Sequence, residues 1–266
     1  MIKVRVVGID HDDDWIFPIT PTIFPDKTSQ IWKLPDEIFY EHYQKTILWD
    51  FENEAELIHV LQLGRLIGFK TFVAPNLYMS YLPYGRQDKV IKNDSTFALK
   101  VFADVLKNSG SFNSISTLDA HNPLYTKMHG IENSMPTLEI KHAIEACDPD
   151  LICFPDKGAL LRGYNVQGIK TFNLDKKRNQ STGQIEGIVY NGDDDFSEKS
   201  ILIVDDLCDA GGTFIGAAKL LKDLDARKVY LYTTHGLYTK GTSILLGNGI
   251  DRLFDKTGER KWEIYY

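Results

Sequence analysis

The chain has 266 residues, of which 43% are hydrophobic and 25% charged, a composition typical of a globular protein with a sizeable core. Its net charge of −7 argues against a nucleic-acid binder, since nonspecific binding depends on a basic surface, but it is compatible with a local phosphate site. No apolar run approaches the roughly 20 residues that cross a bilayer. The three cysteines lack metal-ligand spacing and no signal-peptide pattern precedes them, so we expect a cytoplasmic protein without membrane association.

Strand-like and helix-like segments alternate along the chain. Apolar residues on both parities predict buried strands, and apolar residues spaced by three and four predict amphipathic helices. In chain order, we expect a strand at Lys3–Ile9, a strand at Thr46–Trp49, a helix at Glu54–Ile67, a strand at Thr71–Ala74, a helix at Thr96–Lys107, strands at Ser114–Leu118, Leu151–Phe154 and Ile201–Val204, a helix at Thr213–Leu224 and a strand at Val229–Thr234. This alternation predicts an α/β fold with mostly parallel sheets flanked by helices.

The two halves of the chain repeat one feature. In each half an expected strand ends in an aspartate that precedes a polar loop, at Leu118-Asp119 and at Val204-Asp205. Two tandem domains of one α/β type would produce this repetition, and we expect them at residues 1–145 and 146–266.

The segment Ile201–Thr213 (ILIVDDLCDAGGT) joins an expected strand to an expected helix. Its adjacent carboxylates can accept hydrogen bonds from the vicinal hydroxyls of a ribose, each worth about 1.5–3 kcal/mol because the acceptor is charged. Its glycines let backbone N–H groups approach a phosphate, whose charge a helix N-terminus favours, and the threonine adds a hydroxyl and can cap the helix. An Asp-capped strand–turn–helix corner is the structural alternative, but this spacing resembles the ribose 5-phosphate motif of type I phosphoribosyltransferases and their relatives. The expected sugar-phosphate residues are Asp205, Asp206, Asp209, Ala210, Gly211, Gly212 and Thr213.

A second polar cluster, Tyr81–Lys89 (YLPYGRQDK), precedes the helix expected from Thr96. Arg86 offers a fork of donors for phosphate oxygens and Gln87 can hydrogen-bond a nucleotide, although the cluster alone is equally compatible with a surface loop. Together with Asp119-Ala-His121 and Lys176-Lys-Arg178, it resembles the ribose-phosphate pyrophosphokinase family. The resemblance extends from about Phe24 to Thr257.

The resemblance implies two tandem phosphoribosyltransferase-like domains: the first carries the ATP loop, and the second carries the ribose 5-phosphate loop. It also implies a homo-oligomer, a dimer or a hexamer, in which the adenine segment at Phe24 comes from a neighbouring subunit. By position in the motifs, it assigns ATP binding to Arg86, Gln87, Asp88, Phe24, Asp26 and His121, and Mg²⁺ to Asp119 and His121. It assigns sugar-phosphate support to Asp156, in a segment that comprises Pro155-Asp156, Gly158 and Arg162, and catalysis to Lys176 and Arg178 of a flexible loop together with His121.

The implied reaction is attack of the 1-hydroxyl of ribose 5-phosphate on the β-phosphorus of ATP, giving phosphoribosyl pyrophosphate and AMP. Catalysis of this kind is positioning and charge neutralisation, with Mg²⁺ as cofactor and ATP as co-substrate. A plain phosphoribosyltransferase is an alternative that leaves Arg86 and Gln87 unexplained. A noncatalytic partner protein of the same family is another, and it expects broken catalytic loops, which this sequence does not have.

The sequence departs from the family pattern in three segments. Ala210 stands where the family usually has a threonine that contacts the 5-phosphate, so one donor is missing. The loss is either tolerated, or the pocket accepts a 5-substituted ribose phosphate such as ADP-ribose, which needs one donor fewer. The adenine segment Phe24–Thr28 lacks the family's glutamate. Around His129–Asn133 the acidic residues tied to allosteric control are replaced, so the resemblance does not extend to that control.

Overall fold

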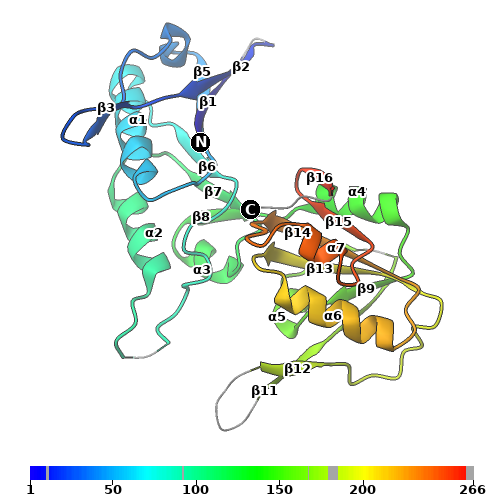
Figure 1. The fold of residues 1–266 in the computed structure, drawn as a ribbon. Helices are drawn as coiled ribbons and strands as arrows, with labels where there is room; N and C mark the ends of the chain where they lie inside the picture. The colour runs from blue at the N-terminus through cyan, green and yellow to red at the C-terminus, as the bar shows by residue number, and fades with distance from the viewer. Residues whose placement is uncertain (10–11, 92, 167, 179–184, 262–266) are drawn as a thin grey trace. The chain divides into compact units, whose positions relative to one another are not determined.

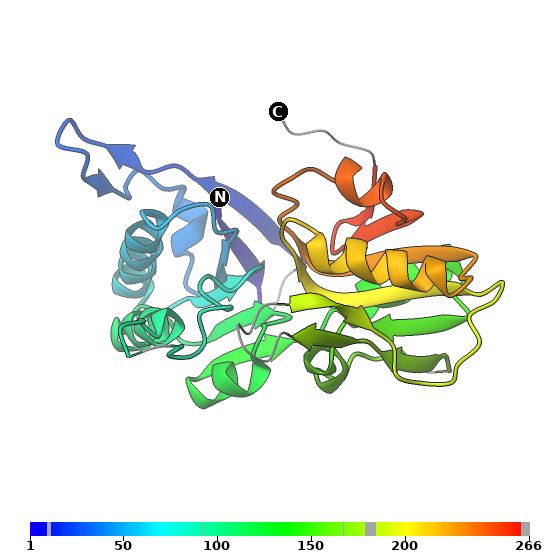
Figure 2. The same ribbon diagram turned by 60° about the horizontal axis from the view of Figure 1, so that its bottom comes forward.

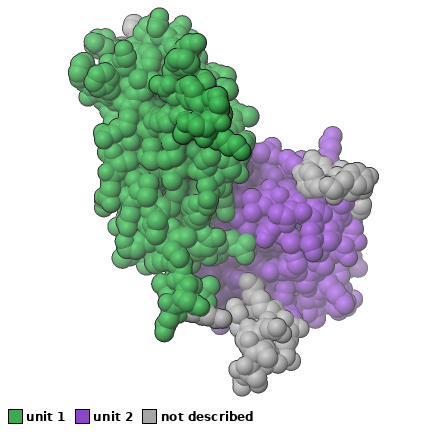
Figure 3. All heavy atoms as spheres, turned by 60° about the vertical axis from the view of Figure 1, so that its left-hand side comes forward, with its two compact units in different colours: residues 1–134 green, residues 135–266 purple. Residues whose placement is uncertain are grey.

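The computed structural model describes residues 1–9, 12–91, 93–166, 168–178 and 185–261, and it leaves the side chains of residues 176–178, 185 and 186 undescribed. The chain divides into two compact units, Met1–Ser134 and Met135–Tyr266, which Figure 3 colours separately. The boundary that we expected at 145/146 lies within α4 (Thr137–Cys147), a helix of the second unit. Among the described residues, no helix is long and apolar enough to cross a bilayer.

The first unit is built on a six-stranded sheet of order β2-β1-β5-β6-β7-β8 (Figure 1). The strands from β5 to β8 are parallel, whereas β1 pairs antiparallel with both β2 and β5. The bounds are β1 (Ile2–Gly8), β2 (Asp14–Ile19), β5 (Tyr43–Trp49), β6 (Asn76–Met79), β7 (Ile115–Leu118) and β8 (Ile131–Ser134), with the short pair β3 (Thr22–Ile23) and β4 (Ser29–Gln30) and the helices η1 (Asp36–Phe39), α1 (Glu56–Thr71), α2 (Ala98–Asn108) and α3 (Pro123–Met128).

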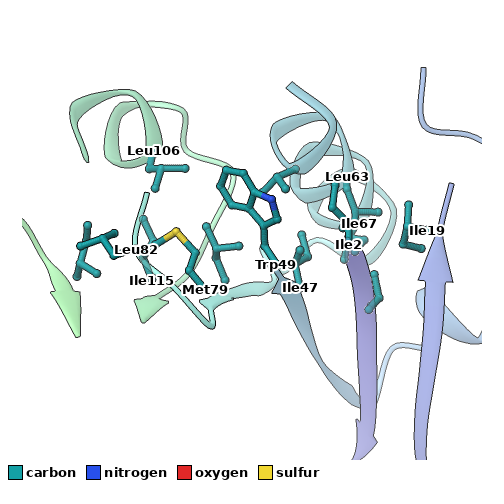
Figure 4. Close-up of a cluster of buried hydrophobic side chains, with 14 of the residues drawn as sticks. Ile2, Ile19, Ile47, Trp49, Leu63, Ile67, Met79, Leu82, Leu106 and Ile115 are labelled. Carbon is teal, nitrogen blue, oxygen red and sulfur yellow. The ribbon is translucent and has the colours of Figure 1, made fainter. Parts of the chain in front are cut away.

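The core of the first unit lies between the sheet and its long helices. Ile47 and Trp49 of β5 are buried and pack with Leu63 and Ile67 from α1 and with Leu106 from α2 (Figure 4). Full burial of such side chains contributes about 1.5–3 kcal/mol each. The indole Nε1 of Trp49 donates to Glu56 Oε2 at 2.9 Å, so the polar atom of this buried ring is satisfied at the first turn of α1.

The second unit is built on a six-stranded sheet of order β10-β9-β13-β14-β15-β16, parallel except at β16 (Figure 2). A separate antiparallel ribbon is formed by β11 and β12. The bounds are β9 (Leu151–Phe154), β10 (Lys170–Asn173), β11 (Asp175–Arg178), β12 (Ile185–Val189), β13 (Ser200–Cys208), β14 (Lys228–Gly236), β15 (Arg252–Asp255) and β16 (Gly258–Arg260), with the helices α4, α5 (Lys157–Leu161), α6 (Gly212–Asp223) and α7 (Ser243–Leu246).

Both faces of this second sheet are covered. Ile201 and Ile203 of β13 belong to a core with α6, whereas Leu202 and Val204 belong to a core with α4. A strand buried on both faces needs apolar residues at every position, which explains the unbroken run Ile201–Val204. The polar residues follow this run, at the carboxyl end of the strand.

The structure confirms the predicted α/β class and the mostly parallel sheets, and it corrects two strands. The strand expected at Thr71–Ala74 is wrong: Thr71 ends α1, with its Oγ1 donating to the Ile67 carbonyl at 2.9 Å, and Phe72 stops the helix in a left-handed conformation. The first strand exists but pairs antiparallel with β2 and β5, and only one of its faces, that of Ile2, Val4 and Val6, lies in the core. We expected apolar residues on both of its faces.

Candidate functional site

The turn between β13 and α6 exposes backbone at the start of a twelve-residue helix. Gly211 is the N-cap with φ 82°, a conformation that favours glycine, and a Cβ there would lie 2.7 Å from Leu245 Cδ2, so a side chain at this position is strained and displaces Leu245. A Cβ at the exposed Gly212 would meet no described atom within 4 Å. The N–H groups of the first turn carry the positive end of the helix dipole and therefore suit an anion. Thr213 does not cap α6, because Gly211 occupies the cap position and no side chain bonds to it.

Arg162 joins the two carboxylates at the end of β13. Its Nη1 lies 2.6 Å from Asp205 Oδ1 and 2.7 Å from Asp206 Oδ1, and the side chains of Arg162, Asp205 and Asp206 are only 8%, 15% and 5% exposed. Asp205 Oδ1 also accepts from the Asp206 backbone N–H at 2.9 Å. One buried guanidinium thus neutralises one of two adjacent carboxylates and fixes their orientation.

The electrostatics of this cluster follow from burial. Burial raises the pKa of Asp205, the charge of Asp206 raises it as well and Arg162 lowers it; together they bring this pKa to about 7. Burial lowers the pKa of Arg162, but Asp206 and Asp205 raise it by more, so the guanidinium stays charged. A carboxylate pair can accept about four hydrogen bonds per group, so the bonds to Arg162 leave acceptor capacity for sugar hydroxyls.

The segment after β9 supports the same edge of the sheet. Asp156 is the N-cap of α5, and its carboxylate accepts a hydrogen bond from the Ala159 N–H at 3.0 Å. This carboxylate therefore already has a structural role at the start of the helix. The short α5 then ends at Arg162, whose Nη1 lies 3.4 Å from Tyr164 Oη. The segment after β9 that was expected to support the sugar phosphate therefore places Arg162 beside Asp205 and Asp206. It does so because β9 and β13 are adjacent parallel strands, whose carboxyl ends lie at the same edge of the sheet.

Asp209 and Ala210 lie in the turn itself and are partly buried. Asp209 Oδ1 accepts a hydrogen bond from Thr239 Oγ1 at 2.7 Å, a contact between distant residues that no local motif predicts. Ala210 has no polar side-chain atom to offer a phosphate. The seven expected sugar-phosphate residues thus follow one another along a single strand–turn–helix unit: Asp205 and Asp206 lie near the end of β13, Asp209, Ala210 and Gly211 form the turn, and Gly212 and Thr213 begin α6.

In the first unit, the turns after β6 and β7 lie together. Asn122 Nδ2 donates to Asp88 Oδ2 at 2.9 Å, and a Cβ at Gly85 would lie 3.9 Å from His121 Cβ. Tyr84 adopts φ 61° and donates its hydroxyl to Glu54 Oε1 at 2.6 Å, which anchors the turn near the start of α1. Adjacent parallel strands bring the two segments together, as expected for one nucleotide site.

Within this site, Arg86, Gln87 and His121 are exposed, and Asp88 is half-buried. Asp119 differs: it is 1% exposed, has φ 44°, and its N–H donates to the Ser134 carbonyl at 2.8 Å. No group of three His, Cys, Asp or Glu side chains suited to a metal occurs in the described parts of the chain. These donors fit Mg²⁺ held mainly by phosphate oxygens, with one or two protein ligands, and they do not form a protein cage.

Phe24 and Asp26 lie at the tip of the β3–β4 hairpin. Asp26 Oδ1 accepts from the Thr28 N–H at 3.0 Å and from Thr28 Oγ1 at 2.7 Å, so its carboxylate holds the turn. The hairpin is fastened to α1 through Gln62, whose Oε1 accepts from the Ile31 N–H at 2.9 Å. Phe24, 38% exposed, lines a cavity of about 750 Å³ along α1. The hairpin is therefore attached to α1. The turn that carries Asp88 is held by a different contact, the bond from Asn122 to Asp88.

Lys176 and Arg178 lie on β11, and their side chains are outside the described part of the structure. The β11–β12 ribbon is seated on α6: in the register, Lys176 pairs with Ile188, and a Cβ at Gly216 of α6 would lie 3.1 Å from Ile188 Cδ1. The ribbon that carries the two basic residues thus packs on the same helix whose N-terminus closes the turn at residues 209–213.

The comparisons with known proteins agree with this geometry. The model of a family described as "Phosphoribosyl synthetase-associated domain" matches residues 188–253, which include β13, α6 and β14. A ribose-phosphate pyrophosphokinase of Thermococcus kodakarensis is 30% identical over 210 residues, which cover 76% of this chain and 73% of that protein. One of Pyrococcus furiosus is 31% identical over 204 residues, covering 74% and 71%.

Among solved structures, the phosphoribosylpyrophosphate synthetase of Mycobacterium smegmatis aligns with a TM-score of 0.72 at 20% identity. The alignment covers 90% of this chain and 79% of that one, and it shows that the fold of two phosphoribosyltransferase-like domains is shared.

Proposed function

This chain belongs to the ribose-phosphate pyrophosphokinase family, and on that premise we propose that it is an ATP-dependent diphosphotransferase. It moves the pyrophosphoryl group of ATP to the 1-hydroxyl of ribose 5-phosphate and releases AMP. The observation that carries the proposal is the Arg162-clamped pair Asp205–Asp206, directly followed by the bare N-terminus of α6. This is a vicinal-diol acceptor beside an anion site, which is the chemistry of ribose 5-phosphate.

In the second unit, Asp205 and Asp206 accept hydrogen bonds from the 2- and 3-hydroxyls of the ribose. The backbone of Asp209–Thr213 holds the 5-phosphate, because Gly212 leaves room for its oxygens and the α6 dipole favours their charge. Arg162 lowers the cost of keeping two adjacent carboxylates ionised while they bind the sugar.

In the first unit, Arg86 and Gln87 bind the triphosphate and the nucleoside side of ATP, and Asp88 shapes the turn through Asn122. Asp119 and His121 would hold Mg²⁺, which would supply charge neutralisation on the triphosphate; His121 is exposed, whereas Asp119 is buried and adopts φ 44° in the turn. Lys176 and Arg178 of the β11–β12 ribbon stabilise the charge that develops on the transferring group. Little covalent help from the protein is needed, because in-line transfer depends on positioning.

Phe24 and Asp26 serve a neighbouring copy of the chain in this scheme, so the active form is a homo-oligomer. In the described part of the chain the hairpin bonds to Gln62 of α1, while Asp88 bonds to Asn122, and this arrangement is compatible with the assignment. The free, buried cysteines Cys147, Cys153 and Cys208 support a cytoplasmic location.

The test is acceptor-dependent release of AMP from ATP and Mg²⁺. We expect ribose 5-phosphate to be the preferred acceptor over ADP-ribose, because the names of the relatives give the 5-substituted acceptor no support. Asp206→Asn should lower kcat/KM by roughly 10- to 100-fold, as loss of a charge-assisted hydrogen bond does. The exposed Glu145→Gln on α4 of the same unit is the matched control. Release of ADP, or AMP release that needs no sugar phosphate, would refute the proposal.

A further inference from the structure

The turn Cys208–Gly212 is contacted by the segment Gly236–Leu246, which runs from the last residue of β14 to the end of α7 and which we call the clasp. The backbone N–H groups of Leu237 and Tyr238 donate to the Cys208 carbonyl at 2.9 and 3.2 Å. Thr239 Oγ1 donates to Asp209 Oδ1 at 2.7 Å, and Leu245 of α7 packs against Gly211. In Figures 1 and 2 the α7 turn lies beside the first turn of α6. The clasp thus contacts three of the five residues of the turn.

The clasp is itself rigid at Tyr238. This residue is 2% exposed with φ 44°, and it lies so close to Gly236 that a Cβ there would come within 2.0–2.5 Å of two of its ring atoms and its hydroxyl oxygen. Its hydroxyl lies 3.5 Å from Thr233 Oγ1 and 3.5 Å from Asp255 Oδ2. The contacts with Gly236 and with Thr233 and Asp255 hold Tyr238 in place. They therefore also fix the position of the next residue, Thr239, and of its hydroxyl.

We propose that Thr239 is a positioning residue of the sugar-phosphate site, whose hydroxyl holds the Asp209 carboxylate away from the N–H groups that receive the 5-phosphate. The inference rests on the proposed function. Asp209 stands two residues before the N-cap of α6, and aspartate side chains at such positions readily bond to backbone N–H groups further along their own turn. Without its bond to Thr239, the carboxylate competes with the phosphate for the same donors and repels it.

The test begins with two variants of one position. Thr239→Val keeps the shape and removes the hydroxyl, whereas Thr239→Ser retains it. The bond is exposed, so we expect a rise of roughly three- to fivefold in KM for ribose 5-phosphate in Thr239→Val, with unchanged kcat and unchanged KM for ATP. Thr239→Ser should restore the wild-type KM. An unchanged KM in Thr239→Val, or an equal rise in both variants, overturns the proposal.

A second measurement asks whether Thr239 acts through Asp209. In an Asp209→Ala background, Thr239→Val should cause no further rise in KM, because the competing carboxylate is already gone. An equal rise in both backgrounds would show that Thr239 acts by another route. Thermal unfolding of each variant excludes a general loss of structure, which would lower kcat and stability together.

The experiments distinguish failure of the proposed function from failure of the proposed role of Thr239. If the wild-type protein releases no AMP with ribose 5-phosphate, the function fails, and the clasp is then judged with inorganic phosphate as probe. Equilibrium dialysis should show phosphate binding weakened roughly three- to fivefold in Thr239→Val and not in Thr239→Ser. Equal phosphate binding by wild type and Thr239→Val overturns the proposed role of Thr239, whatever the activity of the enzyme.

Discussion

Replacing Arg162 by methionine removes the only positive charge that the described contacts place on both Asp205 and Asp206. The three side chains are between 5% and 15% exposed, so the pair left behind cannot be hydrated as in open water. Removing one partner of a buried ion pair typically costs about 3–5 kcal/mol. We therefore expect the free energy of unfolding of the second unit to fall by about that amount near neutral pH.

The pH dependence of this loss has a defined sign. Burial and Asp206 raise the pKa of Asp205 to about 7, above its unfolded value, so the stability that this group contributes is present below about pH 4 and is lost as the pH rises to about 7. Arg162 lowers that pKa, so Arg162→Met raises it further and extends the loss above pH 7. The deficit relative to wild type should be larger at about pH 8.5 than at about pH 6.

The assay is hydrogen exchange of the β13 amides in graded urea, since this strand reports opening of the second unit. Lys141→Met is the matched control, because Lys141 forms an exposed i,i+4 pair with Glu145 at 3.6 Å and should matter by less than about 0.5 kcal/mol. A loss in Arg162→Met no greater than that of the control, or a deficit that shrinks as the pH rises, would refute the account of the cluster.

Three further predictions concern the proposed roles. Lys176→Ala should lower kcat by roughly a hundredfold or more in the AMP-release assay, with exposed Lys199→Ala as control, and intact turnover would remove Lys176 from catalysis. Gly211→Ala should lower the free energy of unfolding by about 1–3 kcal/mol, measured by urea titration, because Gly211 has a φ of 82° and contacts Leu245. Gly212→Ala should fold normally and raise KM for ribose 5-phosphate, measured by steady-state kinetics. His121→Ala should raise KM for Mg·ATP roughly tenfold and leave KM for ribose 5-phosphate unchanged, and a change in the sugar-phosphate KM alone would assign His121 elsewhere.

Elements that depend on local pattern could be predicted from the sequence. The strand Leu151–Phe154 was predicted with its observed bounds, because burial on both faces forces an unbroken apolar run. The first strand shows the opposite pattern: IKVRVVG alternates, as a strand with one open face does, and this local pattern does not distinguish parallel from antiparallel pairing. At Thr71–Ala74 three apolar residues imitate a strand, yet Phe72 is 90% exposed after the helix end.

In the candidate site, too, local features could be predicted and long-range contacts could not. The residues Asp205–Thr213 lie within one short segment, so the order of strand, turn and helix could be predicted from its composition. The contacts that hold it come from distant parts of the chain, and neither the Arg162 bridge to both carboxylates nor the Thr239 bond to Asp209 leaves a local sequence signal. Asn122 is an exception, since an asparagine before Pro123 is the pattern of a helix start, and it proved to cap α3 and bond to Asp88.

The most direct test of the central claim follows the phosphorus atoms. Wild-type protein is incubated with Mg²⁺, ribose 5-phosphate and ATP labelled at the β-phosphorus, and the products are separated. Our account predicts labelled pyrophosphate on the 1-oxygen of the sugar and an equal amount of unlabelled AMP. Labelled ADP, or labelled phosphate that never becomes attached to the sugar, would contradict it.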